Sequence, residues 1–243
     1  VIAIVVFTFA LSLLTKSTDE SIHNQDRMLC DSARISGNKS YLSKCDCYYP
    51  TENDRLKLER VLKYLNGTRD MKLVLDGVGE LVVDGFIDAG FGSHADAKSH
   101  TGLVVKLAGS TVLCKSSKQK IVTKDSTEAE LVALSDMKNE VIKCWEFVVE
   151  QGYDLPPPKL LQDNMSTIEI VKHGGGKYRN KYMRVRQALV KESIDNGEAE
   201  VRFVRTQDMA ADIFTKALQG KLFFDMASGL LGSAKQPDAT GVR

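Results

Sequence analysis

The stretch DSTEAELVAL, residues 125–134, opens the longest helical pattern of the chain. Asp125 and Glu128, three positions apart, predict a capping box at its start, and Gly152 predicts its end. Glu130 fits a plain amphipathic helix poorly, because it lies in the first turn directly beside the apolar stripe. A first-turn glutamate also interacts favourably with the helix dipole, so the rest of the chain must decide its role. The apolar stripe has the spacing of one buried helix face: Leu131, Leu134, Val141, Ile142, Trp145, Val148 and Val149.

Strand and helix patterns on both sides of this helix indicate the fold class. Five segments are predicted as strands: 81–88, 102–107, 111–115, 159–163 and 199–204. Further helical patterns cover residues 53–65, 180–193 and 209–218, and another runs through Ile168, Ile170 and Val171 until the glycines at 174–176 break it. Short turn residues at 108–110 predict a hairpin between the second and third strands. The order predicts an α/β domain with a mixed five-stranded sheet, three antiparallel strands followed by parallel crossovers, flanked by helices.

Composition excludes a disordered chain, because 43% of the 243 residues are hydrophobic and 27% are charged. The net charge of +1 means that any nucleic-acid affinity must come from local basic patches. The cysteines show neither a paired framework nor metal-ligand spacing, which favours free thiols in a reducing, intracellular compartment. They are Cys30, Cys45, Cys47, Cys114 and Cys144.

The N-terminal region has a different character from the rest. Because the first residue is valine, we expect a fragment or a processed piece. Residues 1–14 form an uncharged apolar run that is shorter than the roughly 20 residues of a membrane span. A buried element and a signal remnant both remain open for this run, and residues 16–50 are expected to be poorly ordered. The predicted division is an N-terminal segment over 1–50, a helix and linker over 51–80, the main domain over 81–218 and a C-terminal helix and tail over 219–243.

Four acidic residues occupy related places in this scheme. Asp88 and Asp163 are predicted at strand ends, Glu130 at a helix start, and Asp212 in the last helix, from which it reaches the same edge. Crowded carboxylates repel one another unless a cation neutralises them. Oxygen ligands of this kind suit Mg²⁺, with Mn²⁺ as an alternative, and two ions about 3.5–4 Å apart would clamp both oxygens of a phosphodiester displacement. The alternative is that these are ordinary solvated acids, since the chain has 32.

Two basic stretches predict contact with a nucleic-acid backbone. Between residues 172 and 191 there are seven Lys or Arg and no acid, with Tyr178 and Tyr182 interleaved. The other stretch lies just before the long helix. The alternative for both is a solvated protein surface. The lysines before the helix are Lys115, Lys118, Lys120 and Lys124, and those singled out in the second stretch are Lys177, Arg179 and Lys181.

An ordered set of motifs closely resembles the ribonuclease H domain of copia-type retrotransposon Pol polyproteins. The motifs are FIDA at 86–89, STEAELVAL at 126–134, QDN at 162–164 and ADIFTK at 211–216. The stretch KSSKQK at 115–120 is similar to the family's segment before the helix. The stretch RVLKYLNGT at 60–68 is similar to its connection to the reverse transcriptase. The likeness covers about residues 50–232.

The resemblance implies a ribonuclease H-like fold and metal-dependent hydrolysis of the RNA strand of RNA–DNA hybrids. It implies that Asp88, Glu130, Asp163 and Asp212 are the catalytic residues and metal ligands. Of the two glutamates in the STEAELVAL motif, Glu130 matches the family's catalytic glutamate, because it precedes Leu-x-Ala as the family's glutamate does, and Glu128 is then the capping residue. The implied partners are the hybrid and the reverse transcriptase domain of the same polyprotein, without a membrane. The implied location is a cytoplasmic retroelement particle or the nucleus.

Selection of RNA requires contacts to the 2′-hydroxyl, for which Asn164 and Ser166 are candidate donors. Their alternative role is an N-cap for the next helix. Gly90 stands where the family commonly has a second Asp, and Tyr182-Met183-Arg184 stands where it commonly has His-x-Asp. Two other functions therefore stay open: a decayed, non-catalytic fragment that keeps the fold and nucleic-acid binding, and another nuclease or transposase-like enzyme with the same acidic edge.

Overall fold

The computed structural model describes residues 52–69, 71–173, 178 and 180–232. The expectations for residues 1–50 and for the tail after residue 232 therefore lie outside the described residues. The chain divides into two compact units between Met71 and Lys72. The described part of the first unit holds the helix α3 (Glu52–Gly67), predicted over 53–65. None of the described helices has the length and apolar character needed to cross a membrane.

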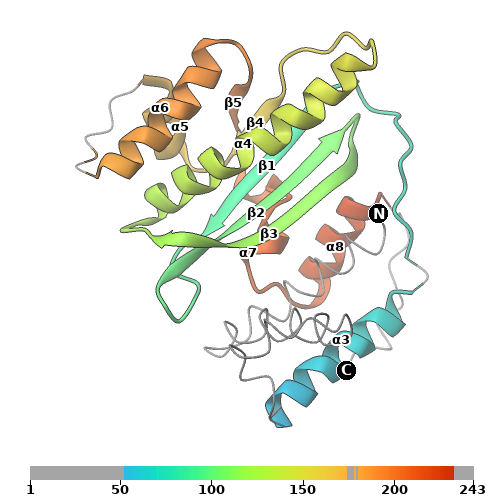
Figure 1. The fold of residues 1–243 in the computed structure, drawn as a ribbon. Coiled ribbons are helices and arrows are strands. Elements are labelled where there is room, and N and C mark those ends of the chain that lie inside the picture. Colours follow the sequence, from blue (N-terminus) through green and yellow to red (C-terminus); the bar gives the residue numbers. More distant parts are fainter. Residues whose placement is uncertain (1–51, 70, 174–177, 179, 233–243) are drawn as a thin grey trace, which may run out of the picture. The chain divides into compact units, whose positions relative to one another are not determined.

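The second unit is built on one five-stranded sheet with the order β3-β2-β1-β4-β5 (Figure 1). β1 pairs antiparallel with β2, which pairs antiparallel with β3, whereas β1–β4 and β4–β5 are parallel pairs. The predicted α/β class and the mixed five-stranded sheet, with three antiparallel strands followed by parallel pairs, are thereby confirmed. The strands are β1 (Val83–Gly90), β2 (Lys98–Leu107), β3 (Ser110–Val122), β4 (Lys159–Gln162) and β5 (Glu200–Phe203).

The hairpin of β2 and β3 is much longer than the sequence predicted. The predicted turn at 108–110 is confirmed in place but is one residue shorter: Ala108 and Gly109 have positive φ, and Ser110 already belongs to β3. β3 continues seven residues beyond its predicted end at residue 115, so the KSSKQK stretch lies within a strand. This part of the hairpin pairs polar residues with polar residues, such as Thr101 with Ser117. A search for apolar alternation does not detect such strands.

The helix α4 (Ser126–Glu150) confirms the prediction made from residues 125–134. Asp125 Oδ1 accepts a hydrogen bond from the Glu128 backbone N–H at 2.8 Å. The Glu128 carboxylate in turn accepts from the backbone N–H of Lys124 at 2.9 Å, one residue earlier than a capping box predicts. α4 lies close against β1, because a Cβ on Gly85 would be 2.5 Å from Val141 Cγ2.

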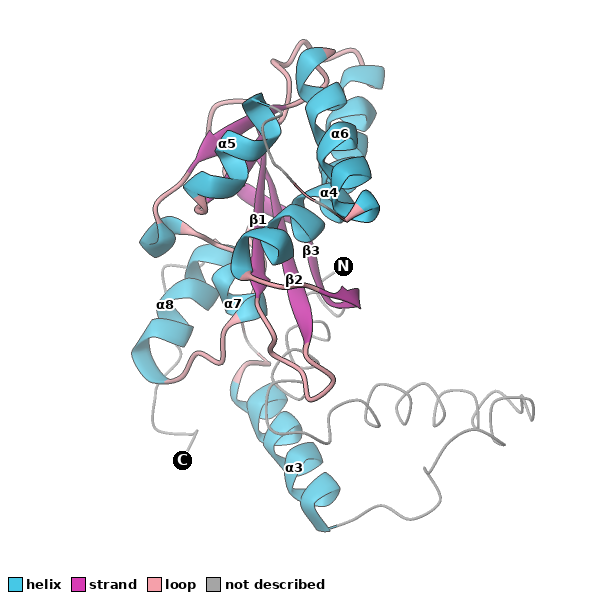
Figure 2. Ribbon diagram, turned by 90° about the vertical axis from the view of Figure 1, so that its left-hand side faces the viewer, coloured by secondary structure: helices cyan, strands magenta, loops and turns pink. Residues whose placement is uncertain are grey.

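The remaining helices complete two layers, one on each face of the sheet (Figure 2). α4 packs on one face and contacts both α5 (Met165–His173) and α6 (Lys181–Asp195). The other face carries α7 (Asp212–Thr215) and α8 (Gly220–Leu231). The predicted helix over 209–218 is wrong in length: a 3-10 turn at Thr206–Asp208 precedes α7, which has only four residues. α7 lies directly on β2, since a Cβ on Gly102 would be 2.9 Å from the Ala211 carbonyl oxygen.

Candidate active site

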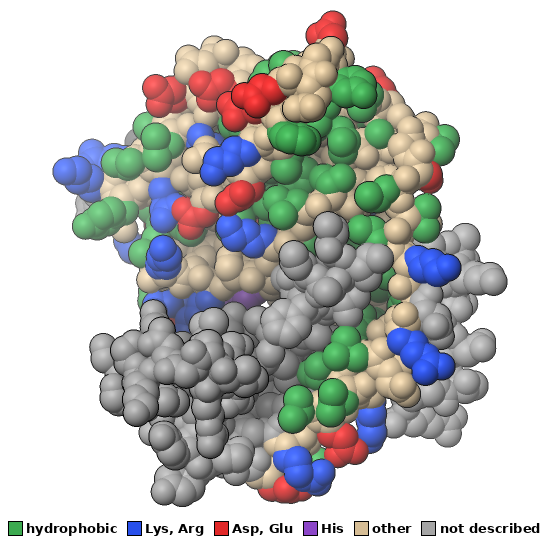
Figure 3. Space-filling view, turned by 45° about the vertical axis from the view of Figure 1, so that its right-hand side comes forward, with side chains coloured by type: hydrophobic (Ala, Val, Ile, Leu, Met, Phe, Trp, Pro, Cys, Tyr) green, Lys and Arg blue, Asp and Glu red, His purple; other side chains and the backbone are tan. Residues whose placement is uncertain are grey.

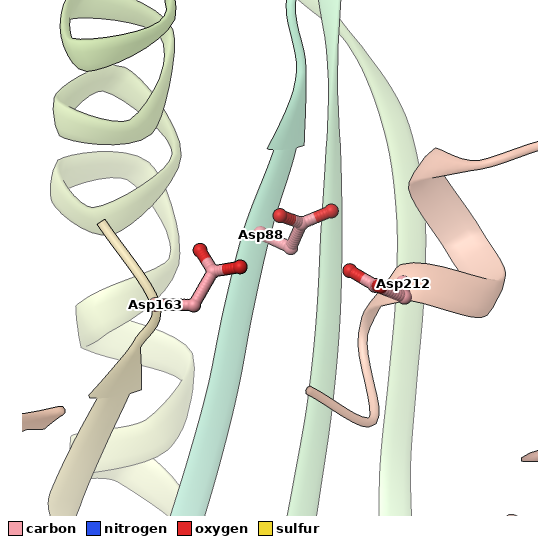
Figure 4. A group of neighbouring side chains, drawn as sticks. All are labelled: Asp88, Asp163 and Asp212. Carbon is pink, nitrogen blue, oxygen red and sulfur yellow. The ribbon is translucent and has the colours of Figure 1, made fainter. Parts of the chain in front are cut away.

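Three aspartates from separate parts of the sequence meet on this second face of the sheet (Figure 4). Asp88 is in β1, Asp163 directly follows β4, and Asp212 is the first residue of α7. One carboxylate oxygen of each lies within 4.8 Å of those of the other two. Asp88 is not at its strand's end as predicted, because β1 continues for two more residues to Gly90.

Each aspartate is held by a neighbouring side chain through one oxygen. Asp88 Oδ2 accepts a hydrogen bond from the Thr215 hydroxyl, and Asp163 Oδ2 accepts one from Thr206 at 2.9 Å. Asp212 Oδ2 pairs with Lys216 Nζ at 2.5 Å. These contacts fix the direction in which the three carboxylates point.

The second oxygen of Asp212 indicates what this group of three is suited to hold. Asp212 Oδ1 is buried and has no hydrogen-bond partner among the described residues. A buried acceptor without a donor is costly, and here it lies beside two further carboxylates. A donor set made only of carboxylate oxygens fits a hard divalent cation such as Mg²⁺ or Mn²⁺. The residues present therefore fit the metal that the sequence predicted.

Glu130 lies beside this group but is not one of its three members. It is in the second turn of α4, not in the first as predicted, and its side chain is buried. Gln162 joins Glu130 to Asp163: the Gln162 amide nitrogen donates a hydrogen bond to Glu130 Oε2 at 3.2 Å. The Gln162 carbonyl oxygen accepts the backbone N–H groups of Asp163 and Asn164 at 2.9 and 3.2 Å. No role was predicted for Gln162 from the sequence, although it stands in the QDN motif at 162–164 and ends an apolar strand beside Asp163.

Burial and nearby negative charge make Glu130, Asp88 and Asp212 hard to ionise without a cation. Burial, reinforced by the charges of Asp88 and Asp163, raises the pKa of Glu130 to about 9. Burial also raises the pKa of Asp212 to about 6, although the ion pair with Lys216 opposes that rise. The pKa of Asp88 is raised by burial as well, against the hydrogen bond from Thr215. Such a site gains from a bound cation, because the cation relieves the repulsion between its ligands.

The raised pKa of Glu130 predicts how stability depends on pH. The folded protein keeps the Glu130 proton between the unfolded pKa of 4.5 and the folded pKa of about 9, whereas the unfolded chain has lost it. Stability of the metal-free protein should therefore fall as pH rises through this window. Thermal unfolding in EDTA between pH 6 and 9 measures this fall, and Glu130→Gln should flatten it. Identical profiles for the two proteins would show that Glu130 ionises normally.

The structure separates the basic residues predicted before the helix. Lys115 and Lys118 are three positions apart in β3 and so lie on opposite faces of the strand. Lys115 pairs with Glu140 of α4 at 3.2 Å, and Lys118 pairs with Asp96 at 2.8 Å. On the face drawn in Figure 3, basic side chains are interspersed with acidic ones and do not form one continuous patch. Lys120 is exposed.

The other predicted binding residues have different surroundings. Asn164 Oδ1 accepts the backbone N–H of Thr167 at 3.1 Å, which is the alternative role as a helix N-cap. Ser166 and Lys181 are exposed near the starts of α5 and α6. Lys177 and Arg179 lie outside the described residues. Contact of any of these with nucleic acid stays a prediction.

Comparison with known proteins finds relatives among the Pol polyproteins of transposons. The chain is 29% identical over 196 residues to the retrovirus-related Pol polyprotein from transposon RE2 of Arabidopsis thaliana. This alignment covers 80% of this chain and 13% of the polyprotein. It is 28% identical over 173 residues to the retrovirus-related Pol polyprotein from transposon TNT 1-94 of Nicotiana tabacum, and the alignment covers 71% of this chain and 13% of that polyprotein. The chain thus spans about an eighth of the length of these relatives. The predicted resemblance to transposon Pol polyproteins is confirmed.

Two further comparisons complete these findings. No protein-family model matches the chain. Among solved structures, LC11-RNase H1 from compost aligns with a TM-score of 0.42 and 15% identity, covering 56% of this chain and 93% of that protein. The N-terminal RNase H domain of rv2228c from Mycobacterium tuberculosis aligns with a TM-score of 0.42 and 13% identity, covering 61% of this chain and 98% of that one.

Proposed function

We propose that this chain, a relative of the Pol polyproteins of copia-type retrotransposons, is a metal-dependent endonuclease that hydrolyses the RNA strand of RNA–DNA hybrids. In this proposal it acts as the ribonuclease H part of a reverse-transcription polyprotein. The observation that carries the proposal is the group of Asp88, Asp163 and Asp212, with oxygens within 4.8 Å of one another and a buried, unpartnered Asp212 Oδ1.

The roles of the residues follow from their positions. Asp88, Asp163 and Asp212 would hold divalent ions, with Glu130 as the fourth ligand. Bound Mg²⁺ supplies an activated water as nucleophile and neutralises charge on the leaving oxygen. Gln162 is the positioning residue, because one amide contacts Glu130 and the backbone of Asp163 at the same time. Thr206 and Thr215 orient two of the aspartates.

Binding of the hybrid would come from basic and polar side chains that the sequence singles out. The exposed Lys120 and Lys181, with Lys177 and Arg179, would contact phosphates and make the affinity depend on salt. Ser166 and the amide nitrogen of Asn164 would be donors to 2′-hydroxyl groups, since Asn164 uses only its oxygen as a helix cap. The reverse transcriptase domain would deliver the hybrid.

The test is cleavage of a labelled hybrid by the purified protein. With Mg²⁺ the RNA strand should be cut, and Asp163→Asn or EDTA should abolish the cutting. Asp195→Asn is the control, because it removes an exposed acid at the end of α6. Cleavage that survives Asp163→Asn would come from a contaminating enzyme, and equal cleavage of duplex DNA would favour another type of nuclease.

The same assay separates the non-catalytic alternative, which Gly90 and Tyr182-Met183-Arg184 favour as departures from the family pattern. A decayed domain would bind the hybrid with a steep dependence on salt and would not cut it.

A further inference from the structure

Lys216 directly follows α7 and contacts the carboxylate group through Asp212. Its Nζ lies 2.5 Å from Asp212 Oδ2. Its backbone N–H donates to the Asp212 carbonyl oxygen at 2.8 Å, which closes one helical turn and keeps the two side chains on the same side. The side chain of Asp212 is 10% exposed, whereas that of Lys216 is 43% exposed.

The charge of Lys216 acts on the whole group, not only on its partner. Burial lowers the pKa of Lys216, but the hydrogen bond to Asp212 and the charges of Asp212, Asp88 and Asp163 raise it above its ordinary value. The ammonium group is therefore fully charged at neutral pH. One positive charge beside three carboxylates offsets part of their repulsion.

We propose that Lys216 is a built-in counter-cation, which neutralises Asp212 in the metal-free protein and releases Asp212 Oδ2 when a divalent ion binds. This inference rests on the proposed function, because the competing ion is the metal of the nuclease. The contact geometry favours release: the lysine is half-exposed and flexible, so its ammonium group moves into water at little cost. The aspartate is buried and stays in place.

Two consequences of opposite sign follow for the protein. Lys216 stabilises the empty site, so removing its charge should destabilise the metal-free protein. Lys216 also competes with the incoming ion, so removing its charge should tighten metal binding. A lysine with a purely structural role would not give the second effect, because loss of structure weakens a metal site.

The experiment is calorimetric titration of the metal-free protein with Mn²⁺, together with thermal unfolding in EDTA. Lys216→Gln should bind Mn²⁺ about tenfold more tightly, the order expected when one positive charge near a divalent ion is removed. It should also unfold at a lower temperature in EDTA. Lys216→Arg keeps the charge and should bind the ion with nearly wild-type affinity.

Lys63→Gln is the matched control. Lys63 pairs with Glu59 at 3.0 Å, with the same spacing and order as Asp212 and Lys216, on the exposed surface of α3. This variant should change neither the Mn²⁺ affinity nor the unfolding temperature. A change equal to that of Lys216→Gln would mean that net charge alone is responsible, and would overturn the proposal.

The outcomes distinguish this inference from the function on which it rests. If the wild-type protein binds no Mn²⁺, the metal-dependent nuclease and the counter-cation both fail. If it binds Mn²⁺ and Lys216→Gln binds it equally or more weakly, only the counter-cation proposal fails.

A second experiment serves if Lys216→Gln does not fold: nitrogen NMR of the Lys216 ammonium group in the wild-type protein. Its signal should move to that of a free lysine when Mg²⁺ is added, and an unmoved signal would overturn the proposal.

Discussion

Asp88→Asn is expected to reduce hybrid cleavage by about a thousandfold or more, and to raise the unfolding temperature of the metal-free protein. Loss of one ligand charge removes several kcal/mol of metal-assisted stabilisation of the transition state, and about 1.4 kcal/mol corresponds to each factor of ten. The gain in stability arises because Asp88 is 3% exposed and lies beside Asp163 and Asp212. A neutral amide of the same shape removes their repulsion and can still accept the Thr215 hydrogen bond.

Asp84→Asn is the control for this pair of effects. Asp84 lies four residues earlier in the same strand and pairs with Lys159 at 3.8 Å, outside the group of three aspartates. It should change neither the cleavage rate nor the stability by a comparable amount. If Asp88→Asn retains cleavage, Asp88 is not a metal ligand of the reaction. If it unfolds at a lower temperature in EDTA than the wild type, the Asp88 carboxylate is not repelled by Asp163 and Asp212 in the metal-free protein.

Phe214→Ala is expected to lower the free energy of unfolding by about 3–5 kcal/mol, the usual cost of removing a fully buried aromatic ring. Phe214 is 0% exposed in α7, and its carbonyl oxygen accepts a hydrogen bond from Ser116 at 3.3 Å. Because α7 has only four residues, its packing is what holds it on the sheet. The variant should therefore also lose activity, since Asp212 and Thr215 belong to the same short helix.

Urea unfolding and the cleavage assay, measured on the same preparations, check this prediction. Phe147→Ala is the comparison, because Phe147 is 63% exposed on α4 and its loss should change stability by no more than about 0.5 kcal/mol. Equal losses of stability in the two variants would show that α7 is not anchored through Phe214. Retained activity in Phe214→Ala would show that Asp212 is positioned by other contacts.

Local sequence patterns were sufficient to predict the helices and strands that have a strong hydrophobic period or a capping signal. The helix from Ser126 was predicted because Asp125 and Glu128 satisfy its first backbone groups and its apolar residues repeat on one face. The four carboxylates were predicted for a similar reason, since they stand beside recognisable strands and helices, and the structure brings three of them together. Local patterns did not show the polar half of the β2–β3 hairpin, or that α7 is so short, because hydrogen-bonded pairing and packing on the sheet determine both.

The sequence by itself therefore determined the fold class and the order of the strands along the chain, because each depends on neighbouring residues. It also predicted which carboxylates belong to the site. Only the tertiary structure decided which oxygens meet, that Gln162 links Glu130 to Asp163, and that Lys216 lies against Asp212. It also placed Lys115 and Lys118 on opposite faces of one strand. The physical reason is that burial and charge interactions act through space, between residues up to about 125 positions apart, and depend on how the sheet and its helices pack.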